Sequence, residues 1–74
     1  MKVRVRLIGR FTETLGFTEK DLSFRGPVTA AGLARRLCLD KVEHVATREG
    51  RPLADGDPLE DGDRVVVAPV FSGG

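Results

Sequence analysis

Two segments with the residue types of a β-strand stand near the two ends of the chain, and only one long helical segment lies between them. From Lys2 to Ile8 every second residue is apolar, which is typical of a strand with one buried face. Residues Arg64 to Val70 form the most apolar strand candidate. We expect these two strands to run parallel, side by side, in the middle of one mixed sheet that a single helix covers on one face.

The segment between the first strand and the helix supplies a second strand and a helix start. Residues Thr18 to Arg25 alternate again and are expected to pair with the first strand. Thr29 is the expected N-cap of a helix from Ala30 to about Leu39, because a threonine hydroxyl can accept a hydrogen bond from a free N–H of the first turn. Leu33 and Leu37 form the buried stripe of this helix.

The second half of the chain indicates two short strands and a loop before the last strand. Residues 42–48 are predicted as a strand, Glu49-Gly50 as a tight turn, and residues 51–54 as a short return strand. Pro52 restricts the return strand to a sheet edge, because proline donates no ladder hydrogen bond. Residues 55–63, rich in Asp, Gly and Pro, are expected to be loop.

The length of 74 residues allows one domain with one thin core. Cys38 is the only cysteine, so no internal disulfide can form, and a core held by packing alone suits a reducing compartment. The longest apolar run, Val65 to Ala68, falls far short of the ~20 residues of a membrane span. We therefore expect a cytoplasmic protein of ordinary globular composition, with 41% hydrophobic and 31% charged residues.

Four closely spaced aspartates invite a calcium-loop interpretation, which the spacing contradicts. Counted from the first of them, the fifth and sixth positions of an EF-hand loop hold Leu59 and Glu60 instead of Asp or Asn and Gly. Two successive Asp-Gly turns are the favoured interpretation, and no metal site is expected. The four aspartates are Asp55, Asp57, Asp61 and Asp63.

Three other polar signals favour ordinary roles. His44 is the only histidine and has no second ligand or nucleophile near it in the sequence, so we expect neither metal binding nor acid–base catalysis. Cys38 is expected to be a small buried hydrophobe. The first strand carries a basic stripe, either a solvated face or a contact for an acidic protein surface. Nucleic acid is not expected, because no aromatic residue interleaves with Lys2, Arg4, Arg6 and Arg10 to stack bases and the net charge is only +1.

The chain stops at Gly73-Gly74, four residues after the last strand. A frayed terminus is one interpretation, yet glycine accounts for only about 7% of ordinary sequences. A Gly-Gly end is a slim peptide with a free carboxylate, and it can enter a narrow channel because no Cβ limits its approach. The carboxylate can attack the α-phosphate of a nucleoside triphosphate, so the pattern indicates a chemical handle.

The C-terminal part of the chain has a pattern in three pieces: Leu59-x-x-Gly62-Asp63-x-Val65, then Ala68-Pro69-Val70, then Gly73-Gly74. This pattern resembles the MoaD/ThiS family of sulfur carriers, with the MoaD branch slightly favoured. The order of strands and helix follows the same family along the whole chain, although Glu49-Gly50 stands where the turn often carries Asn-Gly. The resemblance implies an α+β fold of the ubiquitin-like β-grasp class. The single domain then spans residues 1–74, with 71–74 as a flexible tail.

The resemblance also implies a function that is not enzymatic in itself. Gly74 would be adenylated and converted to a thiocarboxylate, Gly73 and Ser72 would lie in the partner's channel, and Phe71 and Val70 would contact the partner at its mouth. The implied partners are an adenylyltransferase related to ubiquitin-activating enzymes, which uses ATP and magnesium, and a synthase subunit that accepts the sulfur. This chain itself would bind no cofactor, metal, nucleic acid or membrane.

Two alternatives stay open beside the sulfur carrier for molybdopterin or for the thiazole of thiamine. A ubiquitin-like modifier, joined to lysines of target proteins, would share the chemistry up to the adenylate. A plain β-grasp interaction module would make no use of the terminal glycines.

Overall fold

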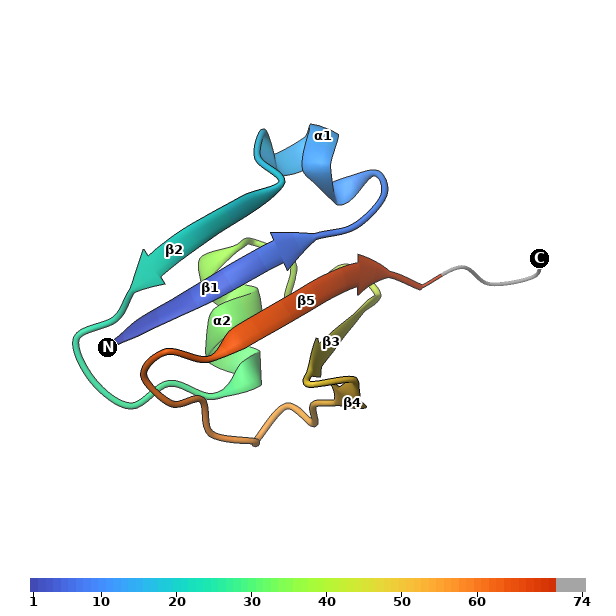
Figure 1. The fold of residues 1–74 in the computed structure, drawn as a ribbon. Helices are drawn as coiled ribbons and strands as arrows, with labels where there is room; N and C mark the ends of the chain where they lie inside the picture. Colours follow the sequence, from blue (N-terminus) through green and yellow to red (C-terminus); the bar gives the residue numbers. More distant parts are fainter. Residues whose placement is uncertain (71–74) are drawn as a thin grey trace.

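The computed structural model describes residues 1–70, and the expected tail of residues 71–74 lies outside the described part. Residues 1–70 form five strands and two helices (Figure 1). In chain order they are β1 (Lys2–Leu7), α1 (Phe11–Leu15), β2 (Glu19–Ser23), α2 (Ala30–Arg36), β3 (His44–Arg48), β4 (Arg51–Pro52) and β5 (Arg64–Pro69). No helix within residues 1–70 is both long and apolar enough to cross a membrane.

The sheet has the order β2-β1-β5-β3-β4. The prediction of a parallel central pair is confirmed, because β1 and β5 pair parallel with Val5 opposite Val65, as Figure 1 shows. All other pairs are antiparallel, and β4 with Pro52 lies at one edge, also as predicted. The strand expected over 42–48 begins only at His44, since the Val42 N–H donates to the Leu39 carbonyl, 3.0 Å away, in the turn before it.

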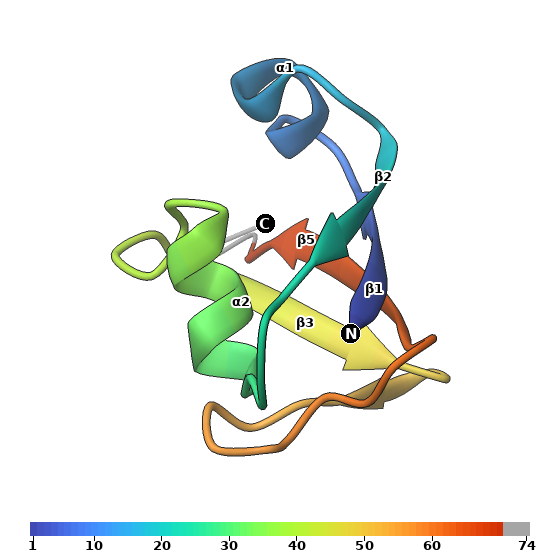
Figure 2. The ribbon, with the colours of Figure 1, turned by 90° about the vertical axis from the view of Figure 1, so that its left-hand side faces the viewer.

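One face of the sheet is covered by α2, and the other carries no helix formed by residues 1–70 (Figure 2). The predicted buried stripe of the helix, Leu33 and Leu37, packs in one core cluster with residues of β1 and β5. Val5 and Val67 are members of this cluster and have exposed fractions of 0% and 2%. Burial alternates along β1, as the sequence predicts, and also along β5, so each strand is divided between a core face and a helix-free face.

The start of α2 agrees with the predicted cap and explains a glycine within the helix. The Gly32 N–H donates to Thr29 Oγ1 at 3.2 Å, which satisfies one of the free donors of the first turn. A Cβ on Gly32 would lie 2.7 Å from Cγ2 of Val28. The side chain of Val28 lies so close over the first turn that it would have to shift to admit a Cβ at residue 32.

The end of α2 corrects two predictions. The helix stops at Arg36 instead of about Leu39, because Cys38 adopts a left-handed backbone with φ of 61°. The Cys38 N–H donates to the Arg35 carbonyl and the Leu39 N–H to the Ala34 carbonyl, the two bonds of a Schellman motif. Cys38 is exposed and not buried as predicted, since the reversal of the chain places Leu39 in the core in its stead.

Replacing Cys38 with glycine is expected to raise the free energy of unfolding by about 0.5–1 kcal/mol. The left-handed conformation costs a non-glycine residue roughly 1–2 kcal/mol, and the substitution removes this cost. The greater conformational entropy of glycine in the unfolded chain offsets part of the resulting stabilisation. Urea denaturation of the two proteins measures the difference. Cys38→Ala is the matched control, because it removes the thiol but keeps the Cβ, and it should give no stabilisation. Equal stability of the glycine and alanine variants would contradict the assignment.

The acidic loop before β5 forms turns, as expected. Asp57 Oδ2 accepts the Ala54 N–H at 2.8 Å, and Asp61 Oδ1 accepts the Lys2 N–H at 2.7 Å. Asp63 Oδ2 accepts the Glu60 N–H at 2.8 Å. These carboxylates bind backbone donors, and no group of three or more metal-ligating side chains gathers within residues 1–70.

Candidate functional site

Of the residues that the sequence predicts at the reactive end of the chain, only Val70 belongs to the described part. Phe71, Ser72, Gly73 and Gly74 lie outside it. Val70 directly follows β5 and has an exposed fraction of 37%. The candidate site is therefore described from its base, which is the end of β5 and the sheet around it.

The end of β5 is held on both sides by neighbouring strands. The Ile8 N–H donates to the Val67 carbonyl at 3.0 Å from the β1 side, and His44 of β3 is paired with Pro69 on the other side. Val65 and Val67 are nearly fully buried, and Pro69 is buried as well. Val70 thus directly follows a strand that is paired on both sides.

His44 has a structural contact near this point. Its Nδ1 lies 2.7 Å from the Val42 carbonyl oxygen, so the ring is attached to the turn before β3. The lone histidine is placed beside the end of β5, yet it belongs to no metal-ligating group among residues 1–70.

The helix-free face carries an apolar row beside the end of β5, which the sequence prediction missed apart from Val70. Ile8 and Val45 have exposed fractions of 38% and 40%. Val45 is paired with Ala68, and Ile8 follows Leu7, which is paired with Val67. The sequence did contain a signal for this row: Ile8 and Val45 are apolar at positions where strand alternation directs the side chain away from the core. We call Ile8, Val45, Ala68 and Val70 the apolar row.

The expected basic stripe on the first strand is divided by ion pairing. Arg4 binds Asp21 at 2.9 Å and Glu19 at 3.3 Å. The hydrogen bond from Arg4 lowers the pKa of Asp21, and the same bond raises the pKa of Arg4. Arg6 and Arg64 are exposed and form no ion pair within residues 1–70. The charge of Arg4 is thus balanced locally, whereas that of the other two arginines is not.

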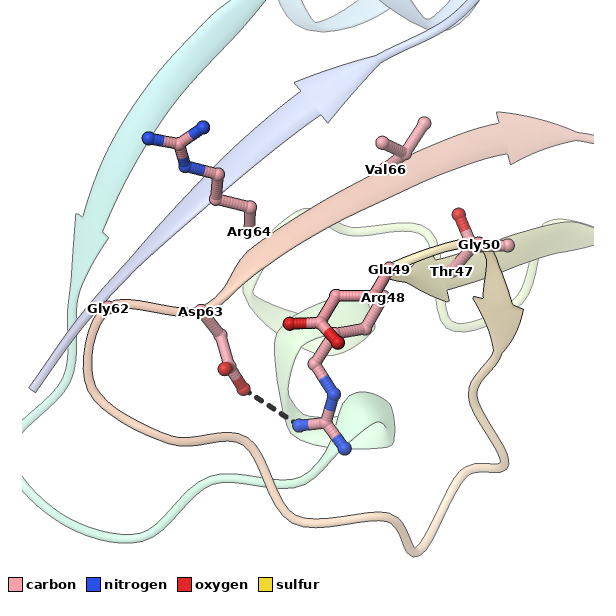
Figure 3. Close-up of a pocket in the computed structure, with 8 residues that line it drawn as sticks. All are labelled: Thr47, Arg48, Glu49, Gly50, Gly62, Asp63, Arg64 and Val66. Carbon is pink, nitrogen blue, oxygen red and sulfur yellow. Dashed lines mark hydrogen bonds and ion pairs between the residues drawn. The ribbon is translucent and has the colours of Figure 1, made fainter.

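On the helix-free face, a groove of about 440 Å³ lies at the start of β5, which is the end of this strand farther from Val70. Its walls are the turn after β3 and the turn before β5, and an ion pair of 2.7 Å joins Arg48 to Asp63 between them (Figure 3). Burial of Asp63 opposes its ionisation, but the Glu60 N–H and the Arg48 guanidinium outweigh this and lower its pKa. The lining residues are Thr47, Arg48, Glu49, Gly50, Gly62, Asp63, Arg64 and Val66.

Three solved structures are similar to this chain over almost their full lengths. SAMP1 from Haloferax volcanii has a TM-score of 0.78 at 19% identity and covers 100% of both chains. A protein described as molybdopterin converting factor, subunit 1, from Pyrococcus furiosus has a TM-score of 0.82 at 23% identity. The match covers 96% of this chain and 99% of the P. furiosus chain. A second structure of the H. volcanii small archaeal modifier protein 1 gives 0.76 at 16% identity, with 95% and 98% covered.

No family model matches the chain, and no curated protein matches its sequence. The structural likeness nevertheless spans both central strands, the covering helix and the edge hairpin, since at least 95% of this chain is matched in each case. The chain therefore has the ubiquitin-like β-grasp fold, which confirms the resemblance to the MoaD/ThiS carriers at the level of the fold.

Proposed function

We propose that this protein is a sulfur carrier whose Gly74 carboxylate is activated and converted to a thiocarboxylate. The observation that carries the proposal is the sequence Val70-Phe-Ser-Gly-Gly74, placed directly after the central strand β5 of a β-grasp sheet. The similar P. furiosus structure is described as a molybdopterin converting factor subunit. This supports a recipient of the molybdopterin type over the thiazole of thiamine.

The proposed chemistry exchanges one oxygen atom for sulfur in two steps. The Gly74 carboxylate attacks the α-phosphate of ATP, and the bond to pyrophosphate breaks, which leaves an acyl-adenylate. A nucleophile of the hydrosulfide class then attacks the carbonyl carbon, AMP leaves with the bridging oxygen, and a thiocarboxylate remains. An adenylyltransferase partner supplies the catalytic groups and holds ATP and magnesium, and a synthase partner accepts the sulfur. This chain supplies the carbonyl carbon and is not itself the enzyme.

Protein modification is the second candidate, and one observation favours it. The H. volcanii structure, which covers the whole of this chain, bears the name small archaeal modifier protein 1 in its second determination. In that case a lysine amine, instead of a sulfur nucleophile, attacks the same adenylate or an ester derived from it. A plain interaction module is the third candidate, and it needs no activated terminus.

The intact mass of protein isolated from its own host separates the three candidates. A sulfur carrier is expected to show a species heavier than the unmodified chain by the difference between one sulfur and one oxygen atom. Alkylation of the thiocarboxylate shifts this species, and a Gly74-deleted chain expressed in the same cells serves as the control. Protein-sized conjugates on a blot that depend on Gly74 would point to a modifier. An unmodified mass with no conjugates would contradict both activated forms.

A further inference from the structure

We propose that the free outer edge of β2 binds an extended acidic segment of a partner protein, which adds to the sheet as a further strand. Strand β2 is the last strand of the sheet on the β1 side, so no strand within residues 1–70 pairs with its outer edge (Figure 1). We call this outer edge the β2 edge. The inference goes beyond the proposed function, because this contact needs neither an activated terminus nor Gly74.

The register of β1 and β2 determines which backbone groups point outward. The Leu7 N–H donates to the Thr18 carbonyl and the Phe24 N–H to the Met1 carbonyl, both at 2.8 Å. In an antiparallel pair every second residue exchanges hydrogen bonds with the neighbouring strand, so the even-numbered residues of β2 bond to β1. The residues whose N–H and C=O groups point away from β1 are Glu19, Asp21 and Ser23.

These outward groups are almost entirely free to bind a partner. Within residues 1–70 none of the three N–H groups donates a hydrogen bond, and only the Ser23 carbonyl accepts one. Its donor is the Arg36 guanidinium at 3.4 Å, which is long for a hydrogen bond. A strand of five residues with open donors and acceptors at regular spacing is a template for another strand.

The opposite edge of the sheet is poorly suited to the same contact. There β4 consists of two residues, Arg51 and Pro52, and proline has no N–H to donate. A very short strand and a proline are both devices that prevent a sheet edge from adding a further strand. The β2 edge has neither device, and its charged side chains instead select which segment can be added.

The charges along the β2 edge favour an acidic segment. On the helix-free face, Glu19 and Asp21 are bound to Arg4 at 3.3 and 2.9 Å, so these charges largely balance one another. The face that α2 covers carries the exposed cations Lys20 and Arg36. Neither cation forms an ion pair within residues 1–70. A carboxylate on this side of an added strand would therefore meet unbalanced positive charge.

Two aromatic rings hold these cations beside the edge without neutralising them. The Lys20 Nζ atom lies 5.6 Å from the centre of the Phe17 ring, and the guanidinium carbon of Arg36 lies 5.5 Å from the centre of the Phe24 ring. Both rings pack against the core cluster. Because every second side chain of a strand lies on one face, the matching segment has acidic residues two or four positions apart.

Other occupants fit the β2 edge less well. Antiparallel pairing of two β2 edges would place Lys20 and Arg36 of one copy near the same cations of the other, and like charges destabilise strand pairs. The phosphates of a nucleic acid offer no donors for the free carbonyls of Glu19 and Asp21. A peptide supplies both donors and acceptors to the edge, and an acidic peptide also supplies the opposite charge.

The test is NMR titration of the full, isotopically labelled chain with a synthetic peptide of about eight residues in which valine and glutamate alternate. We expect a Kd on the order of 100 µM. The largest amide shifts and the strongest slowing of hydrogen exchange should fall on the outward N–H groups of Glu19, Asp21 and Ser23. A valine–lysine peptide should not bind, and a counterpart with methylated backbone nitrogens should bind at least about tenfold more weakly, because it lacks the donors.

A charge-reversal variant tests the two cations. For Lys20→Glu/Arg36→Glu we expect the Kd of the valine–glutamate peptide to rise about tenfold or more. The increase should shrink in high salt, because the Debye length falls from about 10 Å at 0.1 M to about 3 Å at 1 M. Lys41→Glu/Arg51→Glu, which changes the net charge equally at exposed residues outside β2, is the matched control and should leave Kd within about twofold.

A second variant tests the backbone contact. Ser23→Pro removes one outward donor and no ladder bond, because the N–H of residue 23 points away from β1, and edge strands tolerate proline at such positions. We expect Kd to rise about tenfold with little dependence on salt. A thermal melt checks that each variant remains folded at the temperature of the titration.

Several outcomes would overturn the proposal. These are no binding at about 1 mM peptide, equal binding of the methylated peptide, and an equal loss in the Lys41/Arg51 control. A dimer of the parent chain in sedimentation that Ser23→Pro abolishes would assign the edge to a second copy. Tighter binding of a single-stranded oligonucleotide at the same amides would assign the edge to nucleic acid. The Gly74-deleted chain should bind the peptide as the parent does, so this test and that of the carrier function can fail separately.

Discussion

A chain that lacks Gly74 is expected to lose at least about 100-fold of its rate of ATP-dependent activation, with its free energy of unfolding changed by less than about 0.5 kcal/mol. Activation requires the carboxylate to reach a fixed phosphate. Removal of one residue shortens an extended chain by about 3.3–3.6 Å, and a misplacement of even 1 Å can cost on the order of 100-fold in rate. Gly74→Val should fail as well, because its branched side chain adds width in a channel shaped for glycine.

The free energy of unfolding should not fall together with the activation rate, because the core lies elsewhere in the chain. The buried cluster extends in sequence from Val3 to Val67, and β5 is paired on both sides before residue 70. ATP–pyrophosphate exchange with the host's activating enzyme and a urea titration measure the two quantities on the same samples. Arg25→Ala is the control, since it keeps the chain length and both glycines and changes only an exposed residue after β2, and it should be activated at close to the parent rate. Normal activation of the truncated chain would remove Gly74 from its proposed role.

The parts of the fold that the sequence predicts are those in which one local pattern determines the outcome. Alternation over Lys2–Ile8 and the continuous apolar run within Arg64–Val70 each predict a strand with a buried face, and burial of these faces brings the two strands together under α2. Thr29 marks the helix start because its hydroxyl satisfies a backbone donor that the helix leaves free. In each case the residue type and the backbone geometry agree.

Predictions failed where the backbone takes a conformation that its residue type does not favour. Left-handed helix ends usually carry glycine, so the cysteine at position 38 did not indicate that the helix ends and the chain reverses there. Glu49 has a φ of 53° in the turn before Gly50, where Asn is the more usual residue. The turn itself was still recognisable, because the following glycine supplies the second position with positive φ.

The candidate site was only partly predictable, since its base depends on which strands become neighbours. Val70 could be singled out from its place before the terminal glycines. Ile8 and Val45 could not, because the two are 37 residues apart in the sequence and come together only through the sheet order β1-β5-β3. The same holds for the pairing of Arg4 with two residues of β2, which decides which arginines of the basic stripe stay available.

Leu33→Ala is expected to cost about 2–5 kcal/mol of unfolding free energy, because it removes a side chain from the centre of the contact between α2 and the sheet. Leu33 has an exposed fraction of 1% and is among the largest fully buried side chains. It borders a small void of about 10 Å³ that Leu37, Ala46 and Val67 also line. Truncation would enlarge this void, and residual cavity volume adds about 24 cal/mol per Å³ to the cost.

The expected loss for Leu33→Ala is a large share of the total free energy of unfolding, so this variant is a stringent test of the packing. At about 0.05–0.15 kcal/mol per residue, a domain of 74 residues has a total stability of only about 4–11 kcal/mol. Urea denaturation measures the change, and Leu33→Met, which roughly conserves volume, should cost less than about 1.5 kcal/mol. A cost below about 0.5 kcal/mol for the alanine variant would show that α2 does not pack through this side chain. At temperatures where it remains folded, Leu33→Ala should still be activated at the parent rate, since it leaves β5 and Gly74 intact. Loss of stability with retained activation is the reverse of the Gly74 result, as expected if a packed β-grasp core only carries and positions a reactive chain end.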